Sequence, residues 1–234
     1  MSTPTSPRKR NQTLVVVNSL GRQASSVIRV ASAVGYTVRA QLRSCARNPQ
    51  LSSELASLHG VTLFEGSLED VNFLNDLFYG ANIAFINTTS WGDEVAIGKS
   101  LAMVAKKAGV KHYIYSSLTD HSTHPRRAGQ PPIDGLPLWK TKFEVEKYVR
   151  EIFGLEATFV YAACYNNNFS SVLPVPLWKL EENGDGFIWK APFHPNYPLP
   201  WLDTEHDVGP TILQILKDGI RKWGGMRYCQ HVVP

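Results

Sequence analysis

The sequence predicts an α/β protein built on a doubly wound parallel sheet, followed by an incomplete second, smaller α/β lobe. Two observations carry this prediction. A buried strand runs directly into a tight turn and a helix over residues 14–34. Further along, short apolar runs alternate with amphipathic helical patterns at a period of about 25 residues, which is typical of right-handed βαβ crossovers.

The first strand, turn and helix form a corner that favours phosphate binding. Residues 14–17 are an apolar run, Gly21 turns the chain, and a helix begins at Arg22. The inward face of this helix is expected to carry Ala24, Val27, Ile28, Ala31 and Val34. A helix start offers N–H groups and the positive end of its dipole to a pyrophosphate, so the corner predicts a dinucleotide-binding Rossmann fold. Asn18 and Ala24 replace the outer glycines of the usual fingerprint, so alone the motif also fits an ordinary strand-to-helix turn.

The remaining elements follow from their apolar patterns. We expect further strands over residues 37–42, 61–64, 83–86, 113–115 and 157–161. We expect one helix marked by Leu51, Leu55 and Leu58 and another through Val71, Leu74, Leu77 and Phe78. Ile97, Leu101, Val104 and Ala108 should line one face of a third helix, and Val145, Tyr148, Val149 and Ile152 should face inward on a fourth. The last helix carries Val208, Ile212, Ile215 and Leu216. Asp207 is predicted to cap the last of these helices, and residues 183–186 to form a hairpin turn.

Ligands of such sheets bind beyond the carboxyl ends of the strands. In this chain nearly all residues at those ends are polar or glycine, at residues 18–21, 43, 66–67, 87–89 and 116–117. The second strand ends at Arg43 without an acid, whereas an acid there would accept hydrogen bonds from a ribose 2′-hydroxyl and disfavour a 2′-phosphate. We therefore expect NAD or NADP to bind with little discrimination.

Composition suggests where the domains of the chain lie and which classes of partner it can bind. We expect a flexible basic tail over residues 1–12, a Rossmann domain over 13–162, and over 163–234 the rest of that domain with the start of the smaller lobe. Of the net charge of +4, three units come from Arg8, Lys9 and Arg10 in the tail. The body is then close to neutral, which argues against direct nucleic-acid binding, and no apolar run is long enough for a membrane span.

The catalytic pair of a short-chain dehydrogenase is missing from the sequence. That chemistry needs a Tyr and a Lys one helical turn apart, in the spacing Y-x-x-x-K. Leu138 stands four residues before Lys142, and Y-x-x-x-K occurs nowhere in the chain. Because an apolar side chain cannot deliver a proton, we expect no hydride transfer by this mechanism. Lys142 is left with two interpretations, a contact to the cofactor or a solvated lysine on a helix face.

Several motifs together resemble the NmrA-like family, fungal regulators of nitrogen metabolite repression. The segments that carry the resemblance are residues 17–23, 85–89, 97–99, 112–117, 165–169, 199–203 and 205–210. The resemblance runs from about residue 13 to residue 227 and implies a catalytically inactive relative of the short-chain dehydrogenases. It also implies binding of NAD and NADP, restraint of a GATA-type zinc-finger activator, and a location in the nucleus and cytoplasm.

The resemblance assigns cofactor contacts to individual residues. They are Asn18, Leu20, Gly21, Arg22, Gln23, Arg43, Asn87, Thr88, Lys142, Tyr165 and Asn168. Leu20 departs from the family's usual Thr, while Leu138 agrees with a family that lacks the tyrosine. Family members continue well beyond the point where the match fails, so we expect a C-terminally truncated chain.

Three functions stay open on this evidence. The first is a non-enzymatic regulator that binds NAD(P) and a transcription factor, the second a reductase acting on an unknown small substrate through another acid, and the third a non-functional fragment. A basic zinc-finger partner would favour an acidic surface on this chain. The candidate acids are Glu181, Glu182, Asp185, Asp203 and Glu205, with Asp207 beside them. The alternative is a solvated acidic loop that contacts nothing.

Overall fold

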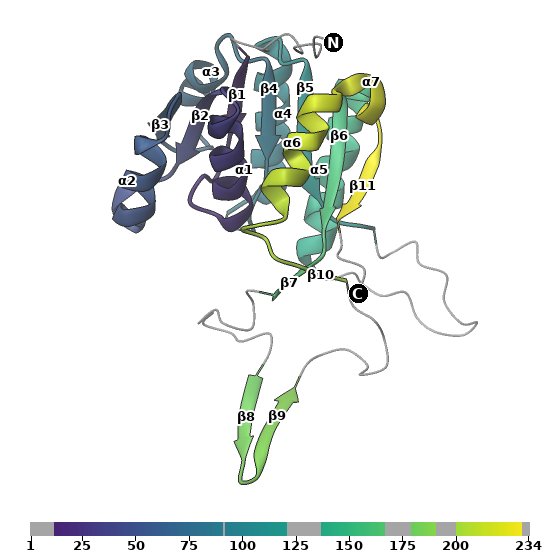
Figure 1. Cartoon of the computed structure of the whole chain (residues 1–234). Helices are drawn as coiled ribbons and strands as arrows, with labels where there is room; N and C mark the ends of the chain where they lie inside the picture. Colours follow the sequence, from purple (N-terminus) through teal and green to yellow (C-terminus); the bar gives the residue numbers. More distant parts are fainter. Residues whose placement is uncertain (1–11, 91, 121–136, 167–178, 191–199, 231–234) are drawn as a thin grey trace, which may run out of the picture.

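Seven parallel strands form one sheet at the centre of the molecule (Figure 1). The computed structural model describes residues 12–90, 92–120, 137–166, 179–190 and 200–230. The sheet has the strand order β11-β6-β5-β4-β1-β2-β3. Its strands are β1 (Thr13–Val16), β2 (Thr37–Leu42), β3 (Val61–Glu65), β4 (Ile83–Ile86), β5 (His112–Ser117), β6 (Ala157–Ala162) and β11 (Arg227–Gln230). This order confirms the predicted doubly wound sheet.

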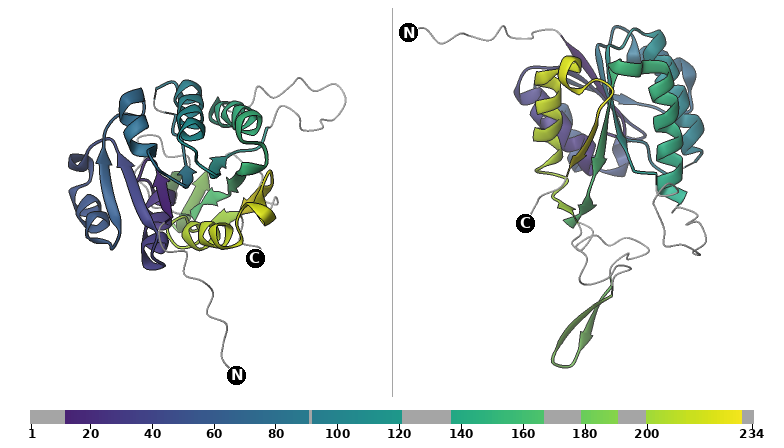
Figure 2. Two further views of the ribbon diagram at one scale, coloured as in Figure 1. Left: turned by 90° about the horizontal axis from the view of Figure 1, so that it is seen from above. Right: turned by 90° about the vertical axis from the view of Figure 1, so that its right-hand side faces the viewer.

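Helices cover both faces of the sheet and make three layers (Figure 2). The helices are α1 (Arg22–Ala33), α2 (Pro49–Ser57), α3 (Val71–Phe78), α4 (Glu94–Lys107), α5 (Pro137–Phe153), α6 (Val208–Asp218) and α7 (Ile220–Trp223), with 3-10 turns η1 (Cys45–Arg47) and η3 (Gly154–Glu156). One face of the sheet packs against α1, α2 and α6, and the other against α3, α4 and α5. The predicted inward residues of these helices are mostly buried.

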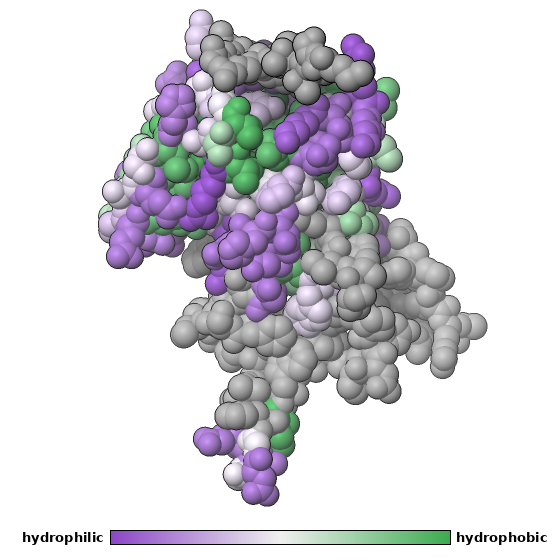
Figure 3. Space-filling model, in the orientation of Figure 1, coloured by the Kyte–Doolittle hydropathy of each residue, from purple (hydrophilic) through white to green (hydrophobic). Residues whose placement is uncertain are grey.

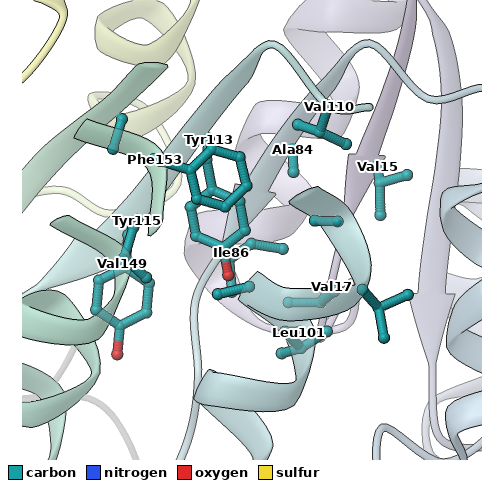
Figure 4. Packing of buried hydrophobic residues seen from close by; sticks show 14 of the residues in the cluster. Val15, Val17, Ala84, Ile86, Leu101, Val110, Tyr113, Tyr115, Val149 and Phe153 are labelled. Carbon is teal, nitrogen blue, oxygen red and sulfur yellow. The ribbon is translucent and has the colours of Figure 1, made fainter. Parts of the chain in front are cut away.

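Alternation along β1 explains why its sequence is apolar throughout. Leu14 and Val16 belong to the core beneath α1 and α6, whereas Val15 and Val17 belong to the core on the opposite face. A strand covered on both faces needs apolar residues at every position. Figure 4 shows the second core, where the rings of Tyr113 and Phe153 stack with centroids 4.6 Å apart.

Three expectations from the sequence need correction. Val34 is half exposed, because α1 ends at Ala33 and the chain turns at Gly35, whose φ is 90°. Asp207 holds the N-cap position of α6 but makes no side-chain cap; its carboxylate accepts a hydrogen bond from the Asp203 N–H at 2.9 Å instead. The seventh strand, β11, was not predicted, and it pairs in parallel with β6.

The chain between β6 and α6 forms two small pairs of strands on the side of the sheet's carboxyl ends (Figure 1). β7 (Cys164–Tyr165) pairs in parallel with β10 (Trp201–Leu202). β8 (Lys179–Asn183) and β9 (Gly186–Lys190) form the predicted hairpin, with Gly184 at a positive φ of 48° in its turn. Since α6 and β11 rejoin the main layers, residues after 162 complete the large domain, while the exact limits of the smaller lobe stay a prediction. Among the described residues, no helix combines the length and apolarity needed to cross a membrane.

Candidate functional site

At β1 the connections between strands change from one face of the sheet to the other. This strand lies between β4 and β2; the connection that follows it passes through α1 on one face, and the connection into β4 passes through α3 on the other. The helices therefore diverge at the carboxyl end of β1 and leave a crevice, which is where ligands of doubly wound sheets bind.

Two adjoining pockets occupy this crevice, with volumes of about 310 and 300 Å³. Asn18, Arg43 and Thr89 line both, so we treat the pockets as one feature, the β1 groove. The first pocket is further lined by Ser67, Leu68, Glu69, Thr88, Gly92 and Ile97, and the second by Leu20, Gly21, Leu42, Arg47 and Asn48. The predicted residues Asn18, Leu20, Gly21, Arg43 and Thr88 are thus brought together.

Asn18 holds the turn after β1 in shape. Its φ of 53° lies in the left-handed region, which Asn tolerates better than most residues. The Asn18 N–H donates to the side-chain oxygen of Gln41 at 2.9 Å, and its Nδ2 donates to the carbonyl of Asn87 at 2.8 Å. The turn is therefore attached to both neighbouring strands, β2 and β4.

The N-terminus of α1 opens toward the groove. Gly21 occupies the N-cap position with extended backbone angles and offers no side-chain cap, and the first turn contains no acidic residue. The first N–H groups of any α-helix lack partners within the helix. With the positive end of the helix dipole beside them, they make this helix start suited to an anion.

Gln23 and Arg22 link the start of α1 to the later part of the chain. Gln23 is buried, and its Nε2 donates a hydrogen bond to the hydroxyl of Tyr165. Burial raises the pKa of Tyr165, so this hydroxyl stays protonated. Arg22 forms an ion pair with Glu205 at 3.8 Å, between two partly exposed side chains. Tyr165 thus positions Gln23, while Asn168, predicted with it, lies outside the described residues.

Lys142 is buried beside the groove, so its interpretation as a solvated lysine is wrong. Its Nζ donates to Asn87 Oδ1 at 3.1 Å and to the Thr88 carbonyl at 2.8 Å, and it pairs with the buried Glu94 carboxylate at 3.4 Å. Burial lowers the pKa of Lys142, an effect that the Glu94 charge opposes. Residue 138 lies one helical turn earlier in α5, as the sequence spacing requires.

Several groove residues were not predicted. Arg47 and Asn48 stand in the second pocket because η1 turns the chain back after β2. The Asn48–Pro49 pair is a signal for that turn and for the start of α2, where Asn48 is the N-cap, but it does not indicate that the turn lies beside α1. Glu94 was not predicted either, although it is the first residue of α4 and lies only six residues beyond Thr88.

The predicted acidic surface is divided into two groups. Glu181, Glu182 and Asp185 lie on the β8–β9 hairpin, the tip of which is hydrophilic (Figure 3). Asp203 and Glu205 lie between β10 and α6, nearer the large domain (Figure 1). Asp203 is engaged locally: it accepts hydrogen bonds from the N–H groups of Glu205 and His206, and its contact with the His206 ring lowers the pKa of Asp203. Glu182, Asp185 and Glu205 are exposed.

Comparisons with known proteins agree with this geometry. The nitrogen metabolite repression protein nmrA of Emericella nidulans is 54% identical over 94% of this chain and 60% of its own length. The corresponding protein nmr of Neurospora crassa is 49% identical over 92% of this chain and 48% of its own length. The chain therefore spans about half to three-fifths of these curated relatives. A more distant relative from Cladobotryum, 28% identical, is described as an NmrA-like family domain-containing oxidoreductase.

Solved structures give the same result. NmrA, described as a negative transcriptional regulator in complex with NAD, superposes with a TM-score of 0.84 at 50% identity, covering 96% of this chain and 68% of that one. The same regulator in complex with NADP superposes with a TM-score of 0.83, covering 95% of this chain and 67% of that one. The model of the NmrA-like family matches residues 10–231, and this chain belongs to the NmrA-like family.

Proposed function

We propose that the chain binds NAD and NADP in the β1 groove, with the pyrophosphate at the start of α1. The observation that carries this proposal is the uncapped N-terminus of α1, opening into a groove where the strand order reverses. Asn18, Gly21 and Arg43 line that groove. The NAD and NADP complexes of the related regulator support the same choice of ligand.

Calorimetric titration with NAD, NADP, NADH and NADPH tests this proposal directly. We expect binding of NAD and NADP with affinities within about tenfold of each other, since no acid follows β2 to repel a 2′-phosphate. Arg43 and Arg47 supply positive charge on that side of the groove. Absence of heat with all four nucleotides would refute the proposal, and a larger preference would refute the lack of discrimination.

We propose that the cofactor-bound chain acts as a negative transcriptional regulator and restrains a GATA-type zinc-finger activator. The repression proteins of Emericella and Neurospora, which share about half of its residues, support a regulatory role. The body of the chain is close to neutral, because three of its four net positive charges lie in residues 8–10. Such a charge disfavours direct DNA binding, so regulation is expected to act through a protein.

The β8–β9 hairpin is the proposed contact for that partner. Glu182 and Asp185 are exposed on it, and a DNA-binding zinc finger is basic, so the charges are complementary. A pull-down with an immobilised GATA-type zinc finger should lose retention when Glu181 and Glu182 are both changed to Lys. Asp76→Lys with Glu151→Lys makes the same change of charge on exposed sites of α3 and α5 and serves as the control. Equal retention of both double variants would exclude the hairpin as the contact.

We propose that the chain lacks dehydrogenase activity. Leu138 occupies the position of the catalytic tyrosine, and no Tyr in the sequence has a Lys four residues later. Because the relative from Cladobotryum is described as an oxidoreductase, a reductase is the second candidate function. Nucleotide oxidation or reduction with a broad panel of carbonyl and alcohol substrates separates the two, and turnover at an ordinary enzymatic rate, about 1 per second or faster, would establish the reductase.

A regulator of this type is proposed to reside in the nucleus and cytoplasm. Arg8, Lys9 and Arg10 form a short basic cluster of the kind used as a nuclear-entry signal. Fluorescence of a tagged chain should appear in both compartments, and changing the three residues to Ala should reduce the nuclear share. Exclusion of the tagged parent from the nucleus would contradict the proposal.

A further inference from the structure

Glu94 is a buried carboxylate in contact with Thr88, a residue that lines the β1 groove. It is the first residue of α4 and is 3% exposed. Its carboxylate accepts hydrogen bonds from the hydroxyls of Thr88, at 2.7 Å, and Thr141, at 2.5 Å. The ion pair with Lys142, at 3.4 Å, completes its surroundings. Its two oxygens are thus engaged by two hydroxyls and an ammonium group, as a buried carboxylate requires.

Lys142 has more protein acceptors than protons to donate. Its Nζ lies within 3.4 Å of Asn87 Oδ1, of the carbonyl and hydroxyl oxygens of Thr88, and of the Ser116 carbonyl, in addition to Glu94. An ammonium group has three N–H donors. Lys142 is therefore fully used in joining the carboxyl ends of β4 and β5 to α5.

From Lys142 the contacts continue to the turn that begins α1. The Asn87 side chain receives a hydrogen bond from Lys142, and the Asn87 carbonyl receives one from Asn18 Nδ2. The Thr88 hydroxyl donates its single proton to Glu94, so the Tyr115 hydroxyl, 2.9 Å away, must donate to Thr88. Glu94 thus stands at one end of a continuous polar chain, and Asn18 in the groove stands at the other.

We propose that Glu94 is a positioning residue of the β1 groove: its charge holds Lys142 against Asn87 and Thr88, and through them fixes the wall that the dinucleotide contacts. This inference rests on the proposed binding of NAD to the groove. Without the carboxylate, Lys142 is a buried cation without its counter-charge, and its most favourable response is to leave the Asn87 and Thr88 oxygens for solvent. Glu94 itself touches no cofactor in this role.

Glu94→Gln tests the role, because it removes the charge and keeps the shape. We expect NAD to bind about tenfold more weakly, which corresponds to about 1.4 kcal/mol. The matched control is Glu146→Gln. Glu146 is fully buried in α5, one turn after Lys142, and pairs with Arg150 and Arg227 on the side of β6 and β11. Its loss should lower the thermal midpoint but leave the NAD affinity unchanged.

A double-mutant cycle shows whether Glu94 acts through Lys142. In a Lys142→Met background, Glu94→Gln should weaken NAD binding by no more than about twofold, because the lysine that it positions is gone. A purely structural role would weaken binding by the same factor with and without Lys142. Thr141→Val, which removes one hydrogen bond from Glu94 but keeps both charges, provides a milder variant if Glu94→Gln fails to fold; we expect NAD binding weakened about threefold.

The outcomes separate this inference from the proposed function. If the parent chain does not bind NAD, the proposed function fails. If the parent binds NAD while Glu94→Gln and Thr141→Val bind it equally well, the positioning role alone is refuted. Equal weakening by Glu94→Gln and Glu146→Gln would likewise refute it, since any buried charge would then have the same effect.

Discussion

Replacing Gly21 with Val tests the proposed pyrophosphate site with little disturbance of the fold. Gly21 has φ −78° and ψ 150°, angles that Val adopts without strain. A Cβ there would lie 3.1 Å from the Asn18 carbonyl oxygen, so the turn must yield by a few tenths of an ångström. The strain is opposed by a gain of about 0.4–1 kcal/mol from the reduced freedom of the unfolded chain. We therefore expect the free energy of unfolding to change by no more than about 1 kcal/mol.

The same substitution should have a large effect on binding. The new side chain would place two methyl groups at the N-terminus of α1, in the pocket that Gly21 lines. A hydrogen bond to a charged group contributes about 1.5–3 kcal/mol, so loss of one phosphate contact corresponds to a tenfold to hundredfold weaker affinity for NAD. Titration calorimetry measures this loss, and urea unfolding measures the stability.

Gly186→Val provides the control for this change. Gly186 lies in the hairpin at a negative φ, with open space around its would-be Cβ, so the same substitution there should leave NAD binding as it is. Binding by Gly21→Val as tight as by the parent would show that the pyrophosphate does not approach the start of α1. The site would then lie elsewhere.

Three further predictions concern single residues outside the start of α1. Gly209→Ala should destabilise the chain by about 2–3 kcal/mol in urea unfolding, because its Cβ would lie 2.6 Å from the Ser26 carbonyl oxygen in α1. An unchanged midpoint would show that α6 shifts freely. Arg43→Glu places an acid after β2 and should weaken the binding of NADP at least about tenfold relative to the binding of NAD. Calorimetric titration with both nucleotides gives the ratio of the two affinities. An unchanged ratio would exclude Arg43 from recognition of the 2′-phosphate. Contacts with Lys222, Gln214 and Trp223 lower the pKa of Asp218 to about 2, below its value in the unfolded chain. The stability that Asp218 contributes is therefore complete above about pH 4 and lost as the pH falls toward 2. In Asp218→Asn, the free energy of unfolding should no longer show this part of the decrease at acid pH. The same pH dependence in the variant and the parent would contradict the prediction.

The parts of the fold that could be predicted are those where a single segment carries its own signal. β1 and β4 are apolar because both faces of the sheet are covered there, and a short apolar run identifies each of them directly in the sequence. β11 carried no such signal, because this short strand of mixed residues, Arg227–Gln230, lies at the sheet edge and pairs among the described residues with β6 alone. Its existence depends on β6, which lies far away in the sequence.

The residues of the site likewise separate into those that a local sequence signal marks and those that depend on a contact distant in the sequence. Asn18, Gly21 and Arg43 were predicted because a strand end or a turn marks each of them. The burial of Lys142 could not be predicted, because it depends on Glu94, which lies on another helix far earlier in the chain. A lysine on a helix is usually solvated, and only the tertiary contact with a buried carboxylate reverses that expectation.

The degraded glycine fingerprint also has a physical explanation. A glycine at position 18 would supply the left-handed turn through its missing side chain. Asn18 reaches the same conformation, donates its backbone N–H to Gln41 in β2 as a glycine could, and adds one further attachment from its Nδ2 to the Asn87 carbonyl after β4. The side chain therefore fixes the turn to the end of β4, which glycine cannot do. The loss of that glycine exchanges backbone freedom for a turn held by one additional hydrogen bond to the chain that leaves β4.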